Sequence, residues 1–471
     1  MRRSLISVFL FALAICLRAG VGDHAEVKGA ERLFDAWIRG QIAYRGLPGI
    51  AVGVVQDQQL IWAQGFGFAD VDAKTPMTPA TKFRMASHSK LFTATAIMQL
   101  REAGKIRLDD PIAKYLPWFK MQPAEPDDPP ITIEELLTHS AGLPREAGPH
   151  WTELEFPTAE GVRKFVAEHQ AAYPPEVRWK YSNLAFTLAG MIIETVSGET
   201  WAAYLQKHIF DPLGMNASSV DKQVDGLATG YGRRMPDGSR AKMPFVDARG
   251  MAAATGLTSN VEDMAKFVSL QFRKGTPGGG QILNTGSLRE MHRVRVLENN
   301  WQRGNAIGFA VSREKDKIYI GHGGGYPGYT THTLIQLDDK VGVIVLTNGD
   351  DTIPADLALH LMQTVGEAVA KAAAVPKPVE WDPSWSRFAG LYRSSGGDTQ
   401  VVELNRRLVM IYPLSPNPEI QTGLTPLGNG QFRNENAVGG GPVGEVVRFV
   451  EQDGKVVRMY TGESYSLRVA P

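Results

Sequence analysis

Three short motifs spread along the chain contain the residue types that acyl transfer from a serine requires. The first is a serine with a lysine three positions later, Ser87 and Lys90. A free hydroxyl is a poor nucleophile at neutral pH, so it needs a base beside it. Residues three apart share a helix face, so the amine can reach the hydroxyl. The N-terminus of such a helix also offers unpaired N–H groups to a developing oxyanion.

The Ser-x-x-Lys spacing occurs four times, and only its context separates the copies. The other three pairs are Ser219/Lys222, Ser239/Lys242 and Ser312/Lys315. These three lie in stretches that read as loops or charged turns. Ser87 and Lys90 alone open a long apolar stretch, which predicts a buried helix ending at Glu102. A buried lysine costs free energy unless it has a partner or a function; the alternative is an ordinary surface helix start.

The second motif is Tyr181-Ser182-Asn183, which precedes a predicted apolar helix over residues 184–197. It is the only Tyr-x-Asn among the 13 tyrosines. The alternative interpretation is a helix cap, in which Ser182 or Asn183 caps the helix that follows.

The third motif is His322 followed by Gly323, Gly324 and Gly325, directly after a strand-like pair. Glycines on an edge strand let a substrate backbone approach and pair. The run also fits Gly-x-Gly-x-x-Gly, but a dinucleotide site requires a helix next, and a strand pattern follows. A simple glycine turn is the alternative.

With these motifs in this order, the sequence resembles the serine β-lactamase and penicillin-binding-protein superfamily. It is most similar to class C β-lactamases, D-aminopeptidases and family VIII esterases. Four further segments resemble the family and extend the similarity over about residues 30–370: Phe83–Lys90, Gly104–Pro111, Thr132–Pro144 and Gly256–Ser259. The segment Phe388–Tyr392 resembles the start of a small lipocalin-like barrel often fused to such enzymes.

The resemblance implies a serine hydrolase that acts on an ester or a peptide-like amide through an acyl-enzyme. Ser87 is then the nucleophile, and Lys90 and Tyr181 share its proton. Asn183 orients the lysine and the substrate amide. The N–H groups of Ser87 and Gly325 form the oxyanion hole. This mechanism predicts a pKa for Lys90 well below the ordinary value of about 10.4.

One departure from the family narrows the expected substrate. The third family motif is often Lys-Thr-Gly, whose cation and hydroxyl help to hold a carboxylate. Here His322 is mostly neutral at pH 7 when unperturbed, and Gly323 carries no hydroxyl. We therefore expect an esterase or peptidase-like hydrolase. The alternatives are a penicillin-recognising D-peptidase or β-lactamase, and a non-catalytic scaffold.

The elements predict an α+β fold with a β-lactamase/transpeptidase-like antiparallel sheet flanked by helices, a helical subdomain, and a separate C-terminal β-barrel. Predicted helices cover residues 31–44, 90–102, 184–197 and 355–374. Predicted strands cover residues 50–55, 60–68, 317–320, 329–337 and 341–347. We expect the hydrolase domain over residues 28–372, a linker over 373–384 and the barrel over 385–471, where Asp453-Gly454 marks a hairpin.

The first 22 residues predict a signal peptide: two arginines, an apolar stretch from Leu5 to Leu17, then small residues. The protein is thus expected to be exported, periplasmic or secreted, with no stable membrane span after cleavage. A lipoprotein is not expected because bulky Ile15 precedes Cys16, the one cysteine of the chain. That count excludes an intrachain disulfide.

Composition narrows the partners. The chain has 471 residues, with 50 Lys and Arg against 50 Asp and Glu. A chain without a basic excess lacks the electrostatic footprint of a nucleic-acid binder. The resemblance implies a small ester, amide or peptide as the partner. His139 lies in a family segment and is interpreted as a packed side chain. No metal and no cofactor are expected.

Overall fold

The computed structural model describes residues 20–220, 222–275, 280–374, 381–413, 421–435 and 443–469. It divides into two compact units, Met1–Ala374 and Val375–Pro471, which we describe separately. Most of the predicted signal peptide, including Cys16, lies outside the described residues. Within the described ranges, no helix is long and apolar enough to cross a membrane.

The larger unit is built on a nine-stranded antiparallel sheet with the strand order β3-β2-β1-β12-β11-β10-β9-β8-β7. The first and last parts of this unit therefore meet at its centre, where β1 pairs with β12. The strand bounds are β1 Gly49–Gln56, β2 Gln59–Asp70, β3 Thr75–Pro76, β7 Val296–Leu297, β8 Arg303–Asn305, β9 Ala310–Glu314, β10 Lys317–Tyr326, β11 Tyr329–Gln336 and β12 Val341–Thr347.

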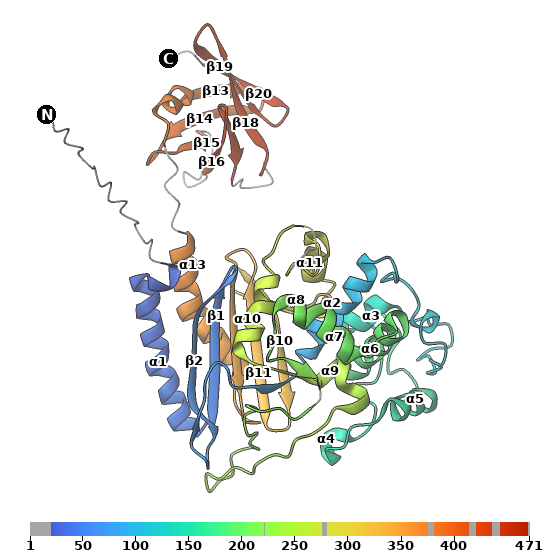
Figure 1. Cartoon of the computed structure of the whole chain (residues 1–471). Helices are drawn as coiled ribbons and strands as arrows, with labels where there is room; N and C mark the ends of the chain where they lie inside the picture. The colour runs from blue at the N-terminus through green and yellow to red at the C-terminus, as the bar shows by residue number, and fades with distance from the viewer. Residues whose placement is uncertain are drawn as a thin grey trace, which may run out of the picture. The chain divides into compact units, whose positions relative to one another are not determined.

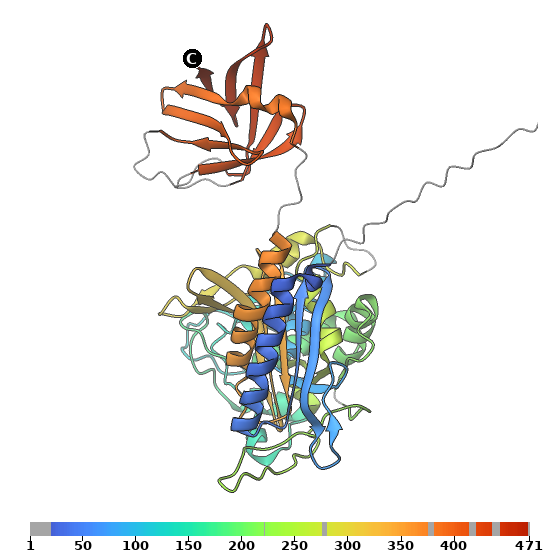
Figure 2. The same ribbon diagram turned by 90° about the vertical axis from the view of Figure 1, so that its left-hand side faces the viewer.

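One face of this sheet is covered by the first and last helices of the unit, which lie side by side in Figure 2. The first is α1 (Ala25–Arg45). The last runs without a break through α12 (Pro354–Leu361), a π-helical turn (Met362–Gly366) and α13 (Glu367–Ala374). Their apolar side chains form one core with the strand residues that point to this face.

The opposite face packs against helices from the middle of the chain (Figure 1). The helices α2 (Ser89–Glu102) and α6 (Asn183–Ser197) are buried along most of their length, because nearly every position is apolar or small. The remaining helices are α3 Ile133–Thr138, α4 His150–Glu153, α5 Ala159–Glu168, α7 Trp201–Leu205, α8 Asp211–Leu213, α9 Ala252–Thr255, α10 Val261–Leu270 and α11 Thr285–His292. This arrangement confirms the predicted α+β fold with a helical subdomain.

A small three-stranded sheet joins the two layers beside the first motif. Its strand order is β4-β6-β5, with bounds β4 Phe83–Ala86, β5 Ser219–Val220 and β6 Leu257–Ser259. The strand β4 leads directly into the turn before α2, so this sheet determines where that helix begins.

The smaller unit contains a closed antiparallel barrel of the eight strands β13–β20, which confirms the predicted C-terminal β-barrel. The bounds are β13 Gly390–Ser394, β14 Gly397–Glu403, β15 Leu408–Ile411, β16 Gln421–Gly428, β17 Gln431–Asn434, β18 Val446–Gln452, β19 Lys455–Thr461 and β20 Ser464–Arg468. Closure leaves no open sheet edge. Helical residues occupy both ends of the predicted linker, since α13 ends at Ala374 and a 3₁₀-helix begins at Pro383. Residues 375–380 lie outside the described ranges.

Candidate functional site

Ser87 lies on a tight turn between β4 and α2. Ala86, just before it, has φ +51°, a left-handed conformation that is uncommon for a residue other than glycine. The turn is held by Ser89, whose Oγ donates to the Ala86 carbonyl (2.7 Å) and accepts from the N–H of Leu257 (2.9 Å). From Phe83 to Met98, Ser87 is the one residue that is not buried. The turn thus presents a single hydroxyl on an otherwise buried segment.

This geometry differs from the expected one in a detail. The helix begins at Ser89, one residue before the predicted start at Lys90 and two residues after the serine of the motif. Ser87 and Lys90 are nevertheless joined by a turn of the chain, because the N–H of Lys90 donates to the Ser87 carbonyl (3.1 Å). Their side chains therefore still lie on one face.

The side chains of Lys90 and Tyr181 converge on the Ser87 hydroxyl. Lys90 Nζ lies 3.0 Å from Ser87 Oγ, and the Tyr181 hydroxyl donates to the same oxygen at 2.8 Å. The amine also donates to Asn183 Oδ1 (2.7 Å) and to the Ala254 carbonyl (2.9 Å). The fold thus brings the first two predicted motifs together, although 91 positions separate Lys90 from Tyr181.

The partners of Lys90 allow only one arrangement for its neutral form. A neutral amine has two hydrogens and one lone pair. Asn183 Oδ1 and the Ala254 carbonyl are acceptors only, so they take the two hydrogens. The lone pair then faces Ser87 Oγ, where it can accept the hydroxyl proton. A fully protonated amine would instead donate to all three oxygens.

Burial makes the neutral form of the amine accessible. Lys90 is fully buried, and desolvation lowers the pKa of its amine well below the ordinary value. Glu146 opposes this shift and Arg145 adds to it. Burial acts in the opposite sense on Tyr181, raising its pKa to about 12. At neutral pH the phenol is therefore protonated, and the pKa of the amine is shifted toward the neutral form.

Ser182 caps α6, as the alternative interpretation of the second motif predicts. The side chains of Tyr181 and Asn183 are not used in this cap. Ser182 Oγ accepts from the N–H of Ala185 (3.0 Å) at the start of α6 and donates to the Pro144 carbonyl (2.6 Å). The residues on either side, Tyr181 and Asn183, point to the serine and the lysine. His139 packs on the Tyr181 ring, with centroids 4.3 Å apart, and accepts from the N–H of Ser182. His139 is a packed side chain, as expected.

The third motif continues strand β10 past Ile320, so the glycine-turn interpretation is wrong. Residues 320–326 pair with β11, whereas the pairing with β9 ends at Gly321. The outer edge of residues 322–325 thus has no strand paired to it, and a substrate backbone can pair there. A β-carbon on Gly325 would meet nothing within 4 Å.

Gly324 is required by close packing. A β-carbon at this position would lie 2.5 Å from the Met85 carbonyl oxygen and 3.2 Å from the β-carbon of Ala86. It would also collide with Thr331 Oγ1. The missing side chain lets β10 lie directly against the turn that presents Ser87. Gly323, one position earlier, faces the other side of the sheet, where His332 lies.

His322 is buried beside the site and carries no charge at neutral pH. Burial, with a smaller contribution from the neighbouring Lys90, lowers its pKa to about 3. Its Nδ1 donates to the Gly323 carbonyl (2.6 Å), and its ring centroid lies 6.4 Å from that of Tyr181. The position that is often a lysine in similar proteins is therefore neutral here.

Two hollows meet beside these residues. A cavity of about 420 Å³ is lined by Trp179, Tyr181 and His322 and extends along β8–β11 to α12. Its lining includes three carboxylates and one guanidinium, Glu298, Glu314, Asp356 and Arg303. A wider groove of about 990 Å³ lies between residues 176–179 and 295–300, and it shares Trp179 and Glu298 with the cavity. A substrate longer than the reacting bond thus has space on both sides of Trp179.

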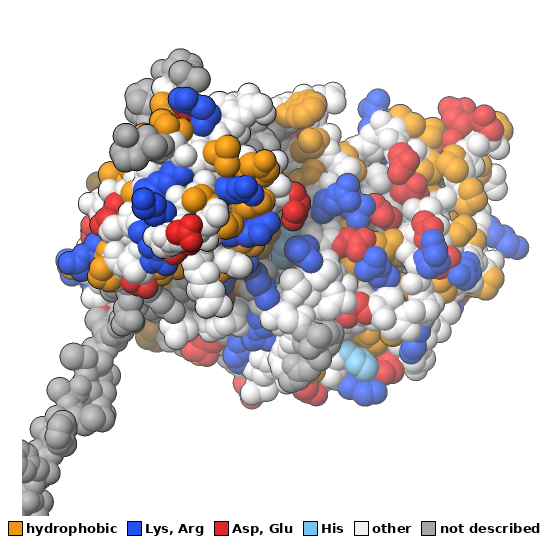
Figure 3. Space-filling model, turned by 90° about the horizontal axis from the view of Figure 1, so that it is seen from above, with side chains coloured by type: hydrophobic (Ala, Val, Ile, Leu, Met, Phe, Trp, Pro, Cys, Tyr) orange, Lys and Arg blue, Asp and Glu red, His pale blue; other side chains and the backbone are white. Residues whose placement is uncertain are grey.

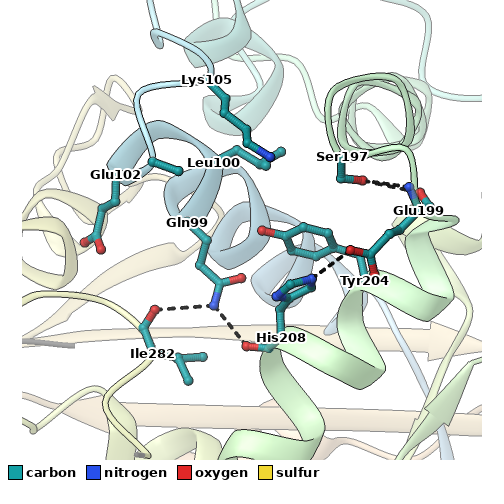
Figure 4. Close-up of a pocket in the computed structure, with 10 residues that line it drawn as sticks. Gln99, Leu100, Glu102, Lys105, Ser197, Glu199, Tyr204, His208 and Ile282 are labelled. Atoms are coloured by element: carbon teal, nitrogen blue, oxygen red, sulfur yellow. Dashed lines mark hydrogen bonds and ion pairs between the residues drawn. The ribbon is translucent and has the colours of Figure 1, made fainter. Parts of the chain in front are cut away.

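A third hollow, of about 430 Å³, lies between the ends of α2 and α6 and the helix α7 (Figure 4). Two of its polar side chains bond within or beside the hollow: His208 to Glu199 (3.0 Å), and Gln99 to the His208 carbonyl (3.0 Å). The serine in its wall, Ser197, donates to the Ile193 carbonyl (2.6 Å) and has no base beside it. This hollow has no acyl-transfer geometry.

No metal site emerges from the described part of the chain, and the face of the larger unit shown in Figure 3 carries no surface of a single charge sign. Among those residues, no group of three or more His, Cys, Asp or Glu side chains is placed to hold a metal ion. Acidic and basic side chains are interspersed over the larger unit, at the right of Figure 3. That pattern fits the equal numbers of acidic and basic residues.

Sequence reasoning missed Glu146 and the Ala254 carbonyl. Asn183 Nδ2 donates to Glu146 Oε1 at 2.7 Å, and the Ala254 carbonyl accepts from Lys90 at 2.9 Å. No motif marks either residue, because each reaches the site only through the packing of the loop before α4 or of α9. Their proximity to resembling segments, two positions after Pro144 and two before Gly256, was the one available signal.

The fold and this site define a β-lactamase/transpeptidase-like protein. The family model described as Beta-lactamase matches residues 34–363. The chain therefore belongs to the beta-lactamase family. The match covers the whole nine-stranded sheet and the site residues Ser87, Lys90, Tyr181 and Asn183.

Individual relatives are similar at low identity. Penicillin-binding protein 4* of Bacillus subtilis (strain 168) is 26% identical over 378 residues, which span 74% of this chain and 81% of that protein. Protein flp of Staphylococcus aureus (strain COL) is 22% identical over 342 residues, 70% of this chain and 66% of that protein. At the level of the family, these comparisons place the chain among serine hydrolases.

Solved structures show the same architecture. The octameric penicillin-binding protein homologue from Pyrococcus abyssi has a TM-score of 0.64 and 26% identity, covering 93% of this chain and 100% of that one. A class C beta lactamase from Rhodobacter sphaeroides has a TM-score of 0.60 and 21% identity, covering 72% of this chain and 98% of that one. At this identity the second likeness concerns the fold alone.

Proposed function

We propose that the protein hydrolyses an ester or a peptide-like amide through an acyl-enzyme on Ser87. The observation that carries this proposal is the position of the Ser87 hydroxyl oxygen, 3.0 Å from the Lys90 amine and 2.8 Å from the Tyr181 hydroxyl. An activated serine needs a base within hydrogen-bond reach. A buried amine with a lowered pKa supplies one near neutral pH.

In acylation, Ser87 Oγ attacks the substrate carbonyl and its proton passes to Lys90. The tetrahedral oxyanion is stabilised by the N–H groups of Ser87 and Gly325. The carbonyl–heteroatom bond then breaks, and Lys90 and Tyr181 relay the proton to the leaving group. Asn183 keeps the amine aimed at the serine. Water then hydrolyses the acyl-Ser87 ester. The same groups act in exchanged roles, taking a proton from water and returning one to Ser87 Oγ, which restores the hydroxyl.

The substrate is expected to lack a carboxylate near β10. His322 is neutral and buried, and Gly323 has no hydroxyl, so neither group of a Lys-Thr-Gly motif is replaced by an equivalent. The cavity beyond His322 carries more carboxylates than cations. Coulomb repulsion from these side chains disfavours an anionic substrate. This favours neutral or cationic esters and amides over β-lactams and peptides that bind through a carboxylate.

The test uses three probes on the wild-type protein and on Ser87→Ala. A fluorophosphonate reports an activated serine, a labelled penicillin reports penicillin recognition, and nitrophenyl esters report turnover. We expect fluorophosphonate labelling and ester turnover, both lost in Ser87→Ala, with turnover reduced by a factor on the order of 10⁴–10⁶. Activity that survives in Ser87→Ala means that the nucleophile is another residue.

A matched set of esters tests the substrate ranking. With one nitrophenyl leaving group and acyl chains ending in a neutral, cationic or carboxylate group, we expect the carboxylate ester to react slowest. The expected difference is about tenfold, which corresponds to about 1.4 kcal/mol. Rapid hydrolysis of a cephalosporin would instead favour the alternative of a penicillin-recognising D-peptidase or β-lactamase. No labelling and no turnover with any probe would favour a scaffold.

We also propose that the protein is exported to the periplasm or secreted. The support is the sequence alone: a basic start, a short apolar stretch and small residues. The intact mass of the protein recovered from cell fractions tests it. An uncleaved chain in the cytosolic fraction contradicts the proposal.

A further inference from the structure

We propose that Glu146 is a positioning residue for the reaction centre: its carboxylate holds the Asn183 amide so that the amide oxygen faces Lys90. This inference rests on the function proposed above, because it concerns the same amine and hydroxyl. Glu146 lies in the loop between α3 and α4 and contacts neither Ser87 nor the open edge of β10 in any described hydrogen bond.

The Asn183 side chain is held between two partners of opposite hydrogen-bonding character. Its Oδ1 accepts from Lys90 Nζ at 2.7 Å, and its Nδ2 donates to Glu146 Oε1 at 2.7 Å. A protonated or neutral amine placed there donates, and a carboxylate only accepts. Reversing the amide would place nitrogen against the amine and oxygen against the carboxylate. Glu146 therefore selects the amide orientation that accepts from the base.

Glu146 is itself fixed from the other side. Its Oε2 lies 3.0 Å from Nε2 of His150, and Arg145 Nε lies 3.1 Å from its Oε1. His150 is 1% exposed and packs on Phe156, with centroids 4.3 Å apart. Its Nδ1 has no hydrogen-bond partner, so the bond to Glu146 is what orients its ring. Glu146 is thus held between Asn183 and a packed imidazole.

The charge on Glu146 follows from these contacts. Its side chain is 15% exposed. Burial raises the pKa of this carboxyl, but hydrogen bonds from His150, Trp151 and Asn183 outweigh that cost, and its pKa lies below the ordinary value. Glu146 is therefore ionised at neutral pH. Its negative charge favours the protonated form of Lys90, whereas burial and Arg145 favour the neutral form.

Titratable or charged groups from every neighbouring element lie around the Lys90 amine and affect its pKa or its surroundings. They are His88 on α2, His139 after α3, Arg145, Glu146 and His150 from the loop and α4, Lys180 and Tyr181 before α6, and His322 on β10. Burial lowers the pKa of His88, His139 and His322 and raises that of Tyr181, so these four are neutral near pH 7. Among the groups named, Glu146 is the one carboxylate.

Two variants separate charge from position. Glu146→Gln keeps the length and an acceptor oxygen but removes the charge. Without that charge, the pKa of Lys90 falls further, so the acid limb of the kcat/KM profile moves to lower pH, by roughly 1 unit. Glu146→Asp keeps the charge but retracts the carboxylate by one methylene. Its acid limb stays in place while kcat falls, by up to about 100-fold for a displacement of about 1 Å.

The matched control is Glu153→Gln, a solvent-facing residue of α4 with the same chemical change. We expect wild-type kcat and pH dependence from it. Thermal unfolding of each variant, measured beside the kinetics, separates loss of folded protein from loss of positioning. A purely structural Glu146 would lower the melting temperature and leave the pH profile of the folded fraction unchanged.

Each outcome decides the inference. A pH profile for Glu146→Gln that superimposes on those of wild type and Glu153→Gln overturns it. If Glu146→Gln does not fold, Glu146→Asp carries the test, and wild-type kcat in that variant overturns it. Failure of the proposed function gives a different result: wild-type protein that takes no fluorophosphonate on Ser87 and turns over no ester.

Discussion

The contact between β10 and the Ser87 turn makes a quantitative prediction for Gly324→Ala. The new β-carbon would lie 2.5 Å from the Met85 carbonyl oxygen, whereas ordinary contact begins at 3.4 Å. Relief of the overlap requires a shift of 3.4 − 2.5 = 0.9 Å between the strand and the turn. The three nearest atoms are the Met85 carbonyl oxygen, the Thr331 hydroxyl and the Ala86 β-carbon, all from buried residues, and side-chain rotation cannot relieve the contact with the Met85 backbone.

Two effects follow from that shift. Overpacking of this kind destabilises by about 1–3 kcal/mol. A unit of about 350 residues has an unfolding entropy of about 0.7 kcal/mol/K, so each kcal/mol lowers the melting temperature by about 1.4 °C. The expected loss is therefore about 1.5–4 °C. Displacing the reacting groups by about 1 Å costs up to about 100-fold in kcat/KM.

Gly325→Ala is the matched control for stability. Its β-carbon meets nothing within 4 Å, and its φ is not positive. A glycine-to-alanine change at an unstrained position stabilises by about 0.4–1 kcal/mol, through the unfolded chain. The assay combines thermal unfolding with the rate of fluorophosphonate labelling. The packing argument fails if Gly324→Ala melts and labels like the wild type, or if Gly325→Ala loses as much stability as Gly324→Ala.

Three further predictions follow from the site. The kcat/KM of the wild type should rise with pH through a pKa well below 10.4, because burial favours neutral Lys90. Protonation of that amine at lower pH removes the base. A rise only near pH 10 contradicts this assignment. Tyr181→Phe removes the hydroxyl that donates to Ser87 Oγ and should lower kcat by about 10²–10⁴-fold. The effect should be largest on substrates with poor leaving groups. Equal loss for good and poor leaving groups argues against a role of Tyr181 in proton transfer. Ser182→Ala removes the cap of α6 and the hydrogen bond to the Pro144 carbonyl. Denaturant unfolding should show that the free energy of unfolding falls by about 1 kcal/mol or more. An unchanged midpoint shows that the cap contributes nothing to stability.

Local patterns in the sequence were sufficient to predict the longest strands and helices of the larger unit. The apolar stretches Ile50–Val55 and Leu60–Phe68, on either side of a polar turn, predict two neighbouring strands, and β1 and β2 pair as a hairpin. The helix predicted over residues 355–374 continues through a π-helical turn that periodicity does not reveal. The strand predicted over residues 317–320 was too short by six residues, since β10 runs to Tyr326. Glycines carry no strand propensity, so pairing with β11 rather than local preference extends it.

Some residues of the candidate site could likewise be predicted from the sequence, and others could not. Residue type and spacing identified Ser87 and Lys90, because acyl transfer needs a nucleophile with a base beside it. The resemblance to the family then implied the roles of Tyr181 and Asn183. The roles of these residues remain predictions. Glu146 has no motif, and its place beside Asn183 exists only because the loop before α4 packs against the start of α6.

The sequence by itself determined which chemistry is available and which local elements carry it. Hydrophobic periodicity and turn residues act over a few positions, so they can be recognised in the sequence without knowledge of the fold. The tertiary structure alone decided the protonation states. Packing of α2, α6 and α9 excludes water from the Lys90 amine and lowers its pKa, and burial against the sheet lowers the pKa of His322 to about 3. Desolvation depends on every atom packed around a group, and those atoms come from segments far apart in the chain.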